Sequence, residues 1–185
     1  MTRALMIIAH PDDDALFGGP FQRAHREMEW EIVCTTYHAA HQRGRELARW
    51  QALNGCRDLA FLDLPDDPGD YEGGVSSFTE ADVLARLGPL DLRADLCLTH
   101  NGRGEYGHPH HVVVGAAARR WAMAAGVLVL EFGFDLAEVD FYVEVPDFFE
   151  AAAACFASQA HLLRIHHEED GLCRTAGYRW HAFRS

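Results

Sequence analysis

The sequence lacks any run of eighteen consecutive apolar residues, so a transmembrane helix is not expected. Its first residues lead directly into a strand-like segment and show no cleavage site of a secretory signal. The five cysteines form no C-x-x-C pair, which disfavours a disulfide framework and a zinc finger. We therefore expect reduced thiols in a cytoplasmic protein. The cysteines are Cys34, Cys56, Cys97, Cys155 and Cys173.

Basic side chains are also scarce. Sixteen Lys and Arg residues stand against 28 Asp and Glu residues, and the formal net charge is −12. A nucleic-acid backbone and an anionic membrane surface both require clustered positive charge, so neither is expected as a partner. A neutral or cationic small molecule fits better. With 185 residues, the chain is long enough for one domain spanning 1–185.

Short apolar runs alternate with helical patterns along the chain. Strands are predicted at Arg3–Ala9, Glu29–Thr36, Leu59–Leu62, Asp95–Thr99, Val127–Glu131 and Asp140–Val145. Helices are predicted at Phe21–Met28, Arg43–Gly55, Phe78–Leu87, Val112–Ala125 and Phe148–Ile165. The tail from His166 to Ser185 is polar, and no strand is predicted there. This alternation predicts a Rossmann-like three-layer α/β/α sandwich with a mostly parallel sheet.

Two clusters of metal-binding residue types follow predicted strands. The first is Ala9-His10-Pro11-Asp12-Asp13-Asp14, after the first strand, and the second is Gly107-His108-Pro109-His110-His111, beyond the fourth. In a doubly wound sheet the first and fourth strands are neighbours, and ligands bind beyond their carboxyl ends. We therefore expect the two loops to meet around one metal ion.

A catalytic zinc site usually takes three protein ligands and keeps one position for water. His10 and Asp13 are three residues apart, which can place both on one side of a turn. The same spacing separates His108 from His111. A site of His10, Asp13 and His111 would leave Asp12 beside the metal-bound water as its general base. His108, if protonated, would stabilise an oxyanion or deliver a proton to a leaving amine.

Other interpretations of the same residues stay open at this point. An acidic loop after a first strand is also typical of a nucleotide ribose site or a Mg²⁺ site. The chain has twelve histidines, so some can cluster on the surface. However, no G-x-G-x-x-G follows the first strand, and both clusters lie at strand ends beside a proline. The combination favours the metal site.

These motifs resemble those of the LmbE-like/PIG-L family of zinc-dependent N-deacetylases. The family's A-H-P-D-D-E is matched by Ala9–Asp14, and its H-x-D-H block by His108–His111. The helix containing Arg43-x-x-Glu46-Leu47 and the segment Ser158-Gln159 resemble further family motifs, with Phe156 where a histidine is usual. The similarity extends over most of the chain.

The resemblance implies His10, Asp13 and His111 as ligands of one Zn²⁺ per chain, or of another divalent metal such as Fe²⁺. It implies Asp12 as the general base and His108 as the electrophilic or acid histidine. The family hydrolyses N-acyl groups, usually acetyl, from glucosamine-type sugars and their conjugates, and some members cleave thiol-conjugate amides. The leading hypothesis is therefore an N-deacetylase, a metal-dependent amide hydrolase acting on an N-acyl amino sugar or its conjugate.

The chain departs from the family pattern in three respects. Asp14 replaces a glutamate, which can alter the support of the ligands but not their number. His110 replaces an aspartate, so a carboxylate that could orient a neighbouring histidine is missing. The chain is also shorter than many members. Elements of the sugar pocket are then either shortened or supplied by a neighbouring subunit of a homo-oligomer.

Four residues are candidates for substrate binding: Arg43, Asp66, Asn101 and Tyr106. The alternatives are a helical ion pair of Arg43 with Glu46, and a solvated acidic loop around Asp66. The acidic and histidine-rich segment 166–170 is expected to be a solvated helix end rather than a second metal site. Two further function hypotheses remain, a non-catalytic zinc-binding or sugar-binding protein and a nucleotide-binding domain.

Overall fold

The protein forms a mixed seven-stranded sheet with the strand order β3-β2-β1-β4-β5-β7-β6. This computed structural model describes residues 1–67, 69–70, 74–134, 136–145, 147–170 and 175–181. The strands are β1 (Arg3–Ile8), β2 (Glu29–Thr36), β3 (Asp58–Leu64), β4 (Leu96–Thr99), β5 (Leu128–Gly133), β6 (Phe141–Glu144) and β7 (Thr175–Trp180). β1 to β5 pair in parallel, whereas β7 pairs antiparallel with both β5 and β6. The predicted mostly parallel sheet is confirmed.

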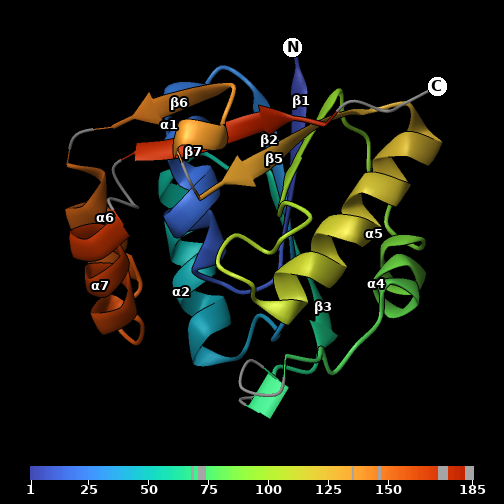
Figure 1. The fold of residues 1–185 in the computed structure, drawn as a ribbon, viewed down its shortest axis with the longest axis horizontal. Coiled ribbons are helices and arrows are strands. Elements are labelled where there is room, and N and C mark those ends of the chain that lie inside the picture. The colour runs from blue at the N-terminus through green and yellow to red at the C-terminus, as the bar shows by residue number, and fades with distance from the viewer. Residues whose placement is uncertain (68, 71–73, 135, 146, 171–174, 182–185) are drawn as a thin grey trace.

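Helices cover both faces of the sheet. They are α1 (Gly19–Ala24), α2 (Gln42–Leu53), α4 (Glu80–Leu87), α5 (Pro109–Ala125), α6 (Phe148–Cys155) and α7 (Ala160–Asp170), together with the π-helix η1 (Asp14–Gly18) and the short 3₁₀ helix η2 (Leu136–Glu138). α4 and α5 lie on one face, and α1, α2, α6 and α7 lie on the other (Figure 1). The predicted three-layer α/β/α arrangement is therefore confirmed. Within the described part of the chain, no helix is both long and apolar enough to span a bilayer.

The continuous apolar run of β1 packs into the hydrophobic cores on both faces of the sheet. Met6 and Ile8 are fully buried in the core under α1, α2 and α6, whereas Leu5 and Ile7 are fully buried in the core under α4 and α5. Successive side chains of a strand point to opposite faces, so a strand covered on both sides must be apolar at every position. β1 therefore lies at the centre of the sheet and ends at the first His/Asp cluster.

The structure corrects two predictions in the C-terminal third. The tail contains β7, which inserts between β5 and β6, and the fully buried Tyr178 ties it to the opposite end of the chain. Tyr178 OH donates to Phe17 O at 2.8 Å and accepts from Phe21 N at 3.1 Å. β7 was missed because only contacts with distant residues stabilise this short segment.

The predicted helix Phe148–Ile165 is instead two helices, α6 and α7. Between them, Ser158 donates its backbone N–H to Glu46 Oε1 at 3.0 Å, and its hydroxyl contacts Oε2 of the same side chain. The carboxylate of α2 thus takes an N–H that an unbroken helix would give to one of its own carbonyls. This contact also joins two segments that carried the family resemblance.

Candidate active site

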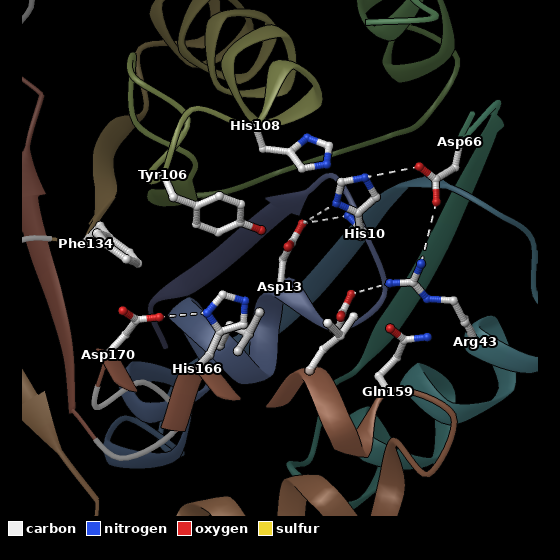
Figure 2. A pocket seen from close by; sticks show the side chains of 13 residues that line it. His10, Asp13, Arg43, Asp66, Tyr106, His108, Phe134, Gln159, His166 and Asp170 are labelled. Atoms are coloured by element: carbon white, nitrogen blue, oxygen red, sulfur yellow. Dashed lines mark hydrogen bonds and ion pairs between the residues drawn. The ribbon is translucent and has the colours of Figure 1, made fainter. Parts of the chain in front are cut away.

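The loops after β1 and β4 meet as predicted, because these two strands are parallel neighbours. The strand order reverses between them, where open α/β sheets form a crevice beyond the carboxyl ends of the strands. A cavity of about 470 Å³ opens there. Its lining comprises His10, Asp12, Asp13, Leu16, Arg43, Asp66, Tyr106, His108, Phe134, Gln159, Leu162, His166 and Asp170 (Figure 2).

The three predicted metal ligands lie together at the floor of this crevice. His10 Nδ1 is 3.5 Å from Asp13 Oδ2, His111 Nε2 is 3.3 Å from Asp13 Oδ1, and the two ring nitrogens are 3.3 Å apart. Ligand atoms of a tetrahedral zinc with bonds of about 2.0–2.2 Å lie about 3.4 Å apart. All three residues are buried. Two imidazole nitrogens at this spacing, each with one oxygen of the Asp13 carboxylate within 3.5 Å, suit one zinc ion.

His111 is held by a buried carboxylate that sequence reasoning missed. Glu105 Oε2 accepts from His111 Nδ1 at 2.6 Å, which leaves Nε2 of His111 as the ligand atom. The same oxygen contacts His100 Nδ1 at 2.8 Å, and His100 Nε2 lies 3.2 Å from Asp13 Oδ2. The signal was present, because His100 directly follows β4 and Glu105 lies in the same loop as the second motif.

His100 and Glu105 shift each other's pKa in opposite directions. Burial alone lowers the pKa of His100, but the carboxylates of Glu105 and Asp13 raise it to about 9. Burial alone raises the pKa of Glu105, but His100 and His111 lower it to about 2. The floor of the site thus buries an imidazole between two carboxylates, and its Nε2 also accepts from Ala9 N at 3.1 Å.

His108 lines the cavity at the start of α5. It is the N-cap of α5, and its Nδ1 accepts from His110 N at 3.2 Å. A neutral His108 therefore carries its proton on Nε2. Burial and the neighbouring His10 and His111 lower the pKa of His108 to about 3, so the ring is neutral at physiological pH. In this neutral form the ring can donate a hydrogen bond from Nε2.

Asp12 lies beside the ligands and is oriented by Arg43. Arg43 Nη2 donates to Asp12 Oδ1 at 2.5 Å, and Nη1 lies 3.5 Å from Asp66 Oδ2. Tyr37 OH accepts from Arg43 Nη1 at 2.9 Å and donates to Asp66 Oδ2 at 2.5 Å. The alternative pairing of Arg43 with Glu46 does not occur, since Glu46 binds Ser158. Arg43 instead joins the carboxylates that follow β1 and β3.

The opposite side of the cavity comes from α7 and two aromatic loop residues. Tyr106 stacks on His166 with ring centroids 5.6 Å apart, and Phe134 packs against Tyr106 at 5.9 Å. Asp170 Oδ2 lies 2.8 Å from His166 Nδ1. Segment 166–170 is therefore not simply a solvated helix end, because both of these α7 residues face the cavity (Figure 2). The chain supplies this wall itself.

Asn101 is the one substrate candidate that does not line this cavity. Its Nδ2 donates to Phe132 O at 2.8 Å, and its Oδ1 accepts from Arg103 N at 2.8 Å and from Glu105 N at 3.3 Å. These bonds fix the loop that carries Glu105. The geometry supports a structural role for Asn101 and gives no support to substrate binding.

Asp14, which stands where the family has a glutamate, does not line the cavity. It is fully buried, and Gln51 of α2 donates to its Oδ2. Burial raises the pKa of Asp14 well above its ordinary value. Asp14 is the first residue of the π-helix that follows the metal loop.

Comparison with known proteins agrees with this geometry. The family model described as "PIG-L: GlcNAc-PI de-N-acetylase" matches residues 5–122, which include both metal motifs. The chain belongs to this family. It is 27% identical over 166 residues to the 1D-myo-inositol 2-acetamido-2-deoxy-alpha-D-glucopyranoside deacetylase of Kineococcus radiotolerans. That match covers 67% of this chain but only 46% of the relative, so the chain spans less than half of the relative's length.

Solved structures with a similar fold match almost the whole length of this chain. The N,N'-diacetylchitobiose deacetylase from Pyrococcus horikoshii has a TM-score of 0.61 at 16% identity, with 97% of this chain and 84% of that chain covered. A 4-carboxy-2-hydroxymuconate hydratase from Pseudomonas putida has a TM-score of 0.67 at 18% identity, with coverage of 100% and 98%. Because these neighbours catalyse different reactions, the fold alone does not identify the reaction.

Proposed function

We propose that the chain is a zinc-dependent hydrolase that removes an N-acyl group, in the first place an acetyl group, from an amino sugar or its conjugate. The observation that carries the proposal is the triangle of His10, Asp13 and His111 at zinc-ligand spacing with Asp12 beside it. The deacetylase relative and the family match support the same reaction class.

Zinc held by these three residues would polarise the amide carbonyl and lower the pKa of a water molecule toward neutrality. Asp12, whose carboxylate Arg43 holds in place, takes the proton of the attacking water and returns it to the leaving amine. His108 donates a hydrogen bond from Nε2–H to the oxyanion that develops on the carbonyl oxygen. A neutral imidazole suffices for that contact.

The charge of the cavity favours a neutral or cationic substrate. Asp12, Asp13, Asp66 and Asp170 face it, and Arg43 is already shared between two of these carboxylates. A polyanion such as a carboxymuconate would meet more repulsion than attraction there. Hydroxyl groups of a sugar can hydrogen-bond to Asp66, and the aromatic side of the cavity can cover a ring face.

Release of free amine from a panel of N-acetylglucosamine conjugates, with the zinc-loaded protein, tests the proposal. A thiol-conjugate amide is included for the amidase alternative, and a 2-hydroxymuconate for hydratase chemistry. We expect amine release from at least one N-acetyl sugar and none with Asp12→Asn. A zinc-loaded protein that binds these sugars without releasing amine would support the non-catalytic alternative. The cytoplasmic location and homo-oligomer remain predictions.

A further inference from the structure

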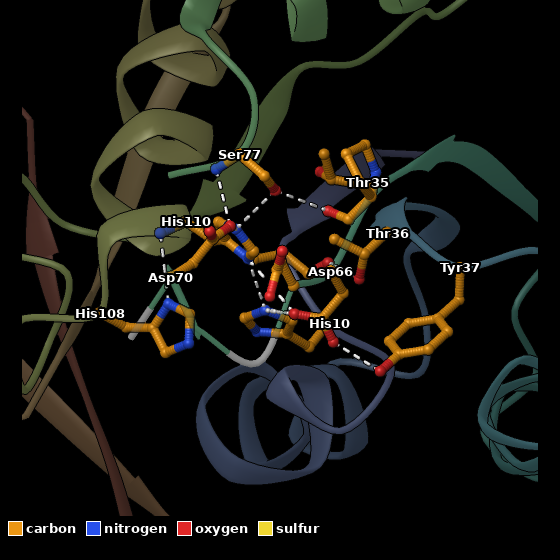
Figure 3. A network of polar contacts seen from close by, with 12 residues as sticks. His10, Thr35, Thr36, Tyr37, Asp66, Asp70, Ser77, His108 and His110 are labelled. Carbon is orange, nitrogen blue, oxygen red and sulfur yellow. Dashed lines mark hydrogen bonds and ion pairs between the residues drawn. The ribbon is translucent and has the colours of Figure 1, made fainter. Parts of the chain in front are cut away.

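The far side of the His10 ring faces a second group of donor atoms (Figure 3). His10 Nε2 lies 3.0 Å from His110 Nδ1 and 3.5 Å from Asp66 Oδ1, and those two atoms are 3.6 Å apart. The separations are close to those of the first triangle and to the value of about 3.4 Å expected around tetrahedral zinc. The two groups share His10, each through a different ring nitrogen.

Asp66 and His110 are both oriented by contacts of the side-chain atoms that do not face His10. Tyr37 OH donates to Asp66 Oδ2 at 2.5 Å, and Arg43 Nη1 approaches the same oxygen, so Oδ1 faces the histidines. His110 Nε2 lies 2.7 Å from Asp70 Oδ2, and a proton donated there leaves the lone pair of His110 on Nδ1. Metal-binding histidines are commonly oriented by a carboxylate in this way.

Packing and access are also suitable for a cation. The ring of His110 is fully buried and stacks on Phe78 with centroids 4.5 Å apart, which holds its Nδ1 in place. Asp66 and His10 line the main cavity, so an ion can enter from there. The ion would replace the proton that His10 Nε2 donates to His110. Two imidazoles and one carboxylate suit zinc and also Co²⁺ or Fe²⁺.

We propose that His10, Asp66 and His110 form a second divalent-cation site in which the His10 ring bridges two ions. His110 supplies an imidazole where the H-x-D-H pattern has a carboxylate. The second site requires only the observed placement of these three side chains. It does not depend on the deacetylase reaction.

Zinc stoichiometry tests this proposal. Each protein is dialysed with excess Zn²⁺, freed of unbound metal and measured by elemental analysis. We expect two equivalents in the wild type and one in Asp66→Asn and in His110→Phe, which preserves the stacking on Phe78. His38→Asn, a change of an exposed histidine, serves as the matched control and should retain two. His111→Gln removes a ligand of the first site only, so the double variant His110→Phe/His111→Gln should bind none.

One equivalent in the wild type overturns the proposal, as does retention of two in either single variant. Circular dichroism checks that the variants are folded, and Asp66→Asn provides the comparison if His110→Phe is not. Titration with Co²⁺ gives a second readout, because the visible absorption of the wild type should rise through two equivalents and that of Asp66→Asn through one. The assay does not measure turnover, so failure of the second site and failure of the deacetylase proposal are distinguishable.

Discussion

The two walls of the cavity are built by different means. The metal wall, residues 10–13, 100–105 and 108–111, holds buried ionisable side chains whose hydrogen bonds connect one to the next. The C-terminal wall, residues 159–170 with Tyr106 and Phe134, is held by ring contacts and by ion pairs such as His166–Asp170. The metal wall is therefore fixed before any ligand binds, whereas the C-terminal wall offers surface to a substrate. We expect reaction chemistry from the first and selectivity from the second.

The largest effect is expected from Asp12→Asn in the metal wall. This change removes the proposed base but no metal ligand, so kcat should fall by about 10²–10⁴ while zinc content stays unchanged. Amine release and elemental analysis on the same sample measure both quantities. Asp91→Asn, on an exposed residue, is the control. Full turnover in Asp12→Asn would remove Asp12 from the mechanism.

A change at Glu105, which contacts a proposed ligand but not the metal, should lower the affinity for zinc. Glu105→Gln removes the carboxylate that orients His111 Nδ1, and we expect a 10–100-fold loss of zinc affinity. Competition with a chelator measures it. Unchanged affinity would mean that His111 is oriented by other contacts. No such loss is expected for His166→Gln, because His166 and its partner Asp170 lie on the opposite side of the cavity from the proposed metal ligands.

The C-terminal wall should influence substrate binding and leave the metal in place. Tyr106→Leu removes the ring that stacks on His166, and a KM increase of about tenfold is expected with little change in kcat or zinc content, because stacking contacts contribute about 0.5–1.5 kcal/mol. Steady-state kinetics over several N-acetyl sugars measures this split. If instead zinc affinity falls, the functional separation of the two walls is wrong.

The smallest effect concerns the stability of the metal-free protein as a function of pH. The pKa of His100 is raised to about 9, so its contribution is complete below about pH 6.5 and is lost as pH rises through 9. The pKa of Glu105 is lowered to about 2, so its contribution is present above about pH 4.5 and is lost as pH falls toward 2. Tm should therefore drop by several degrees between pH 6.5 and 9. His100→Gln should flatten this dependence, and an unchanged slope would contradict it.

Sequence reasoning predicted the metal wall well because its information is local. The first motif directly follows β1, and the second lies in the loop between β4 and α5. Three-residue spacing can place His10 and Asp13 on one side of a turn. The parallel pairing of β1 with β4 followed from the strand–helix alternation. These features are short-range patterns or topological rules, so they can be recognised without coordinates.

Only the tertiary structure decided the rest. The insertion of β7 and the break between α6 and α7 depend on contacts between residues more than a hundred positions apart. The position of His166 in the cavity depends on its contact with Tyr106, which lies in the loop between β4 and α5. The protonation states of His100, Glu105 and His108 likewise depend on which charges are buried together. The sequence by itself thus determined the sheet and the proposed ligand set that it presents. Folding determined the charge of the residues around those ligands, the C-terminal wall and the second group of donor atoms at His10, because each arises from long-range packing that no local pattern encodes.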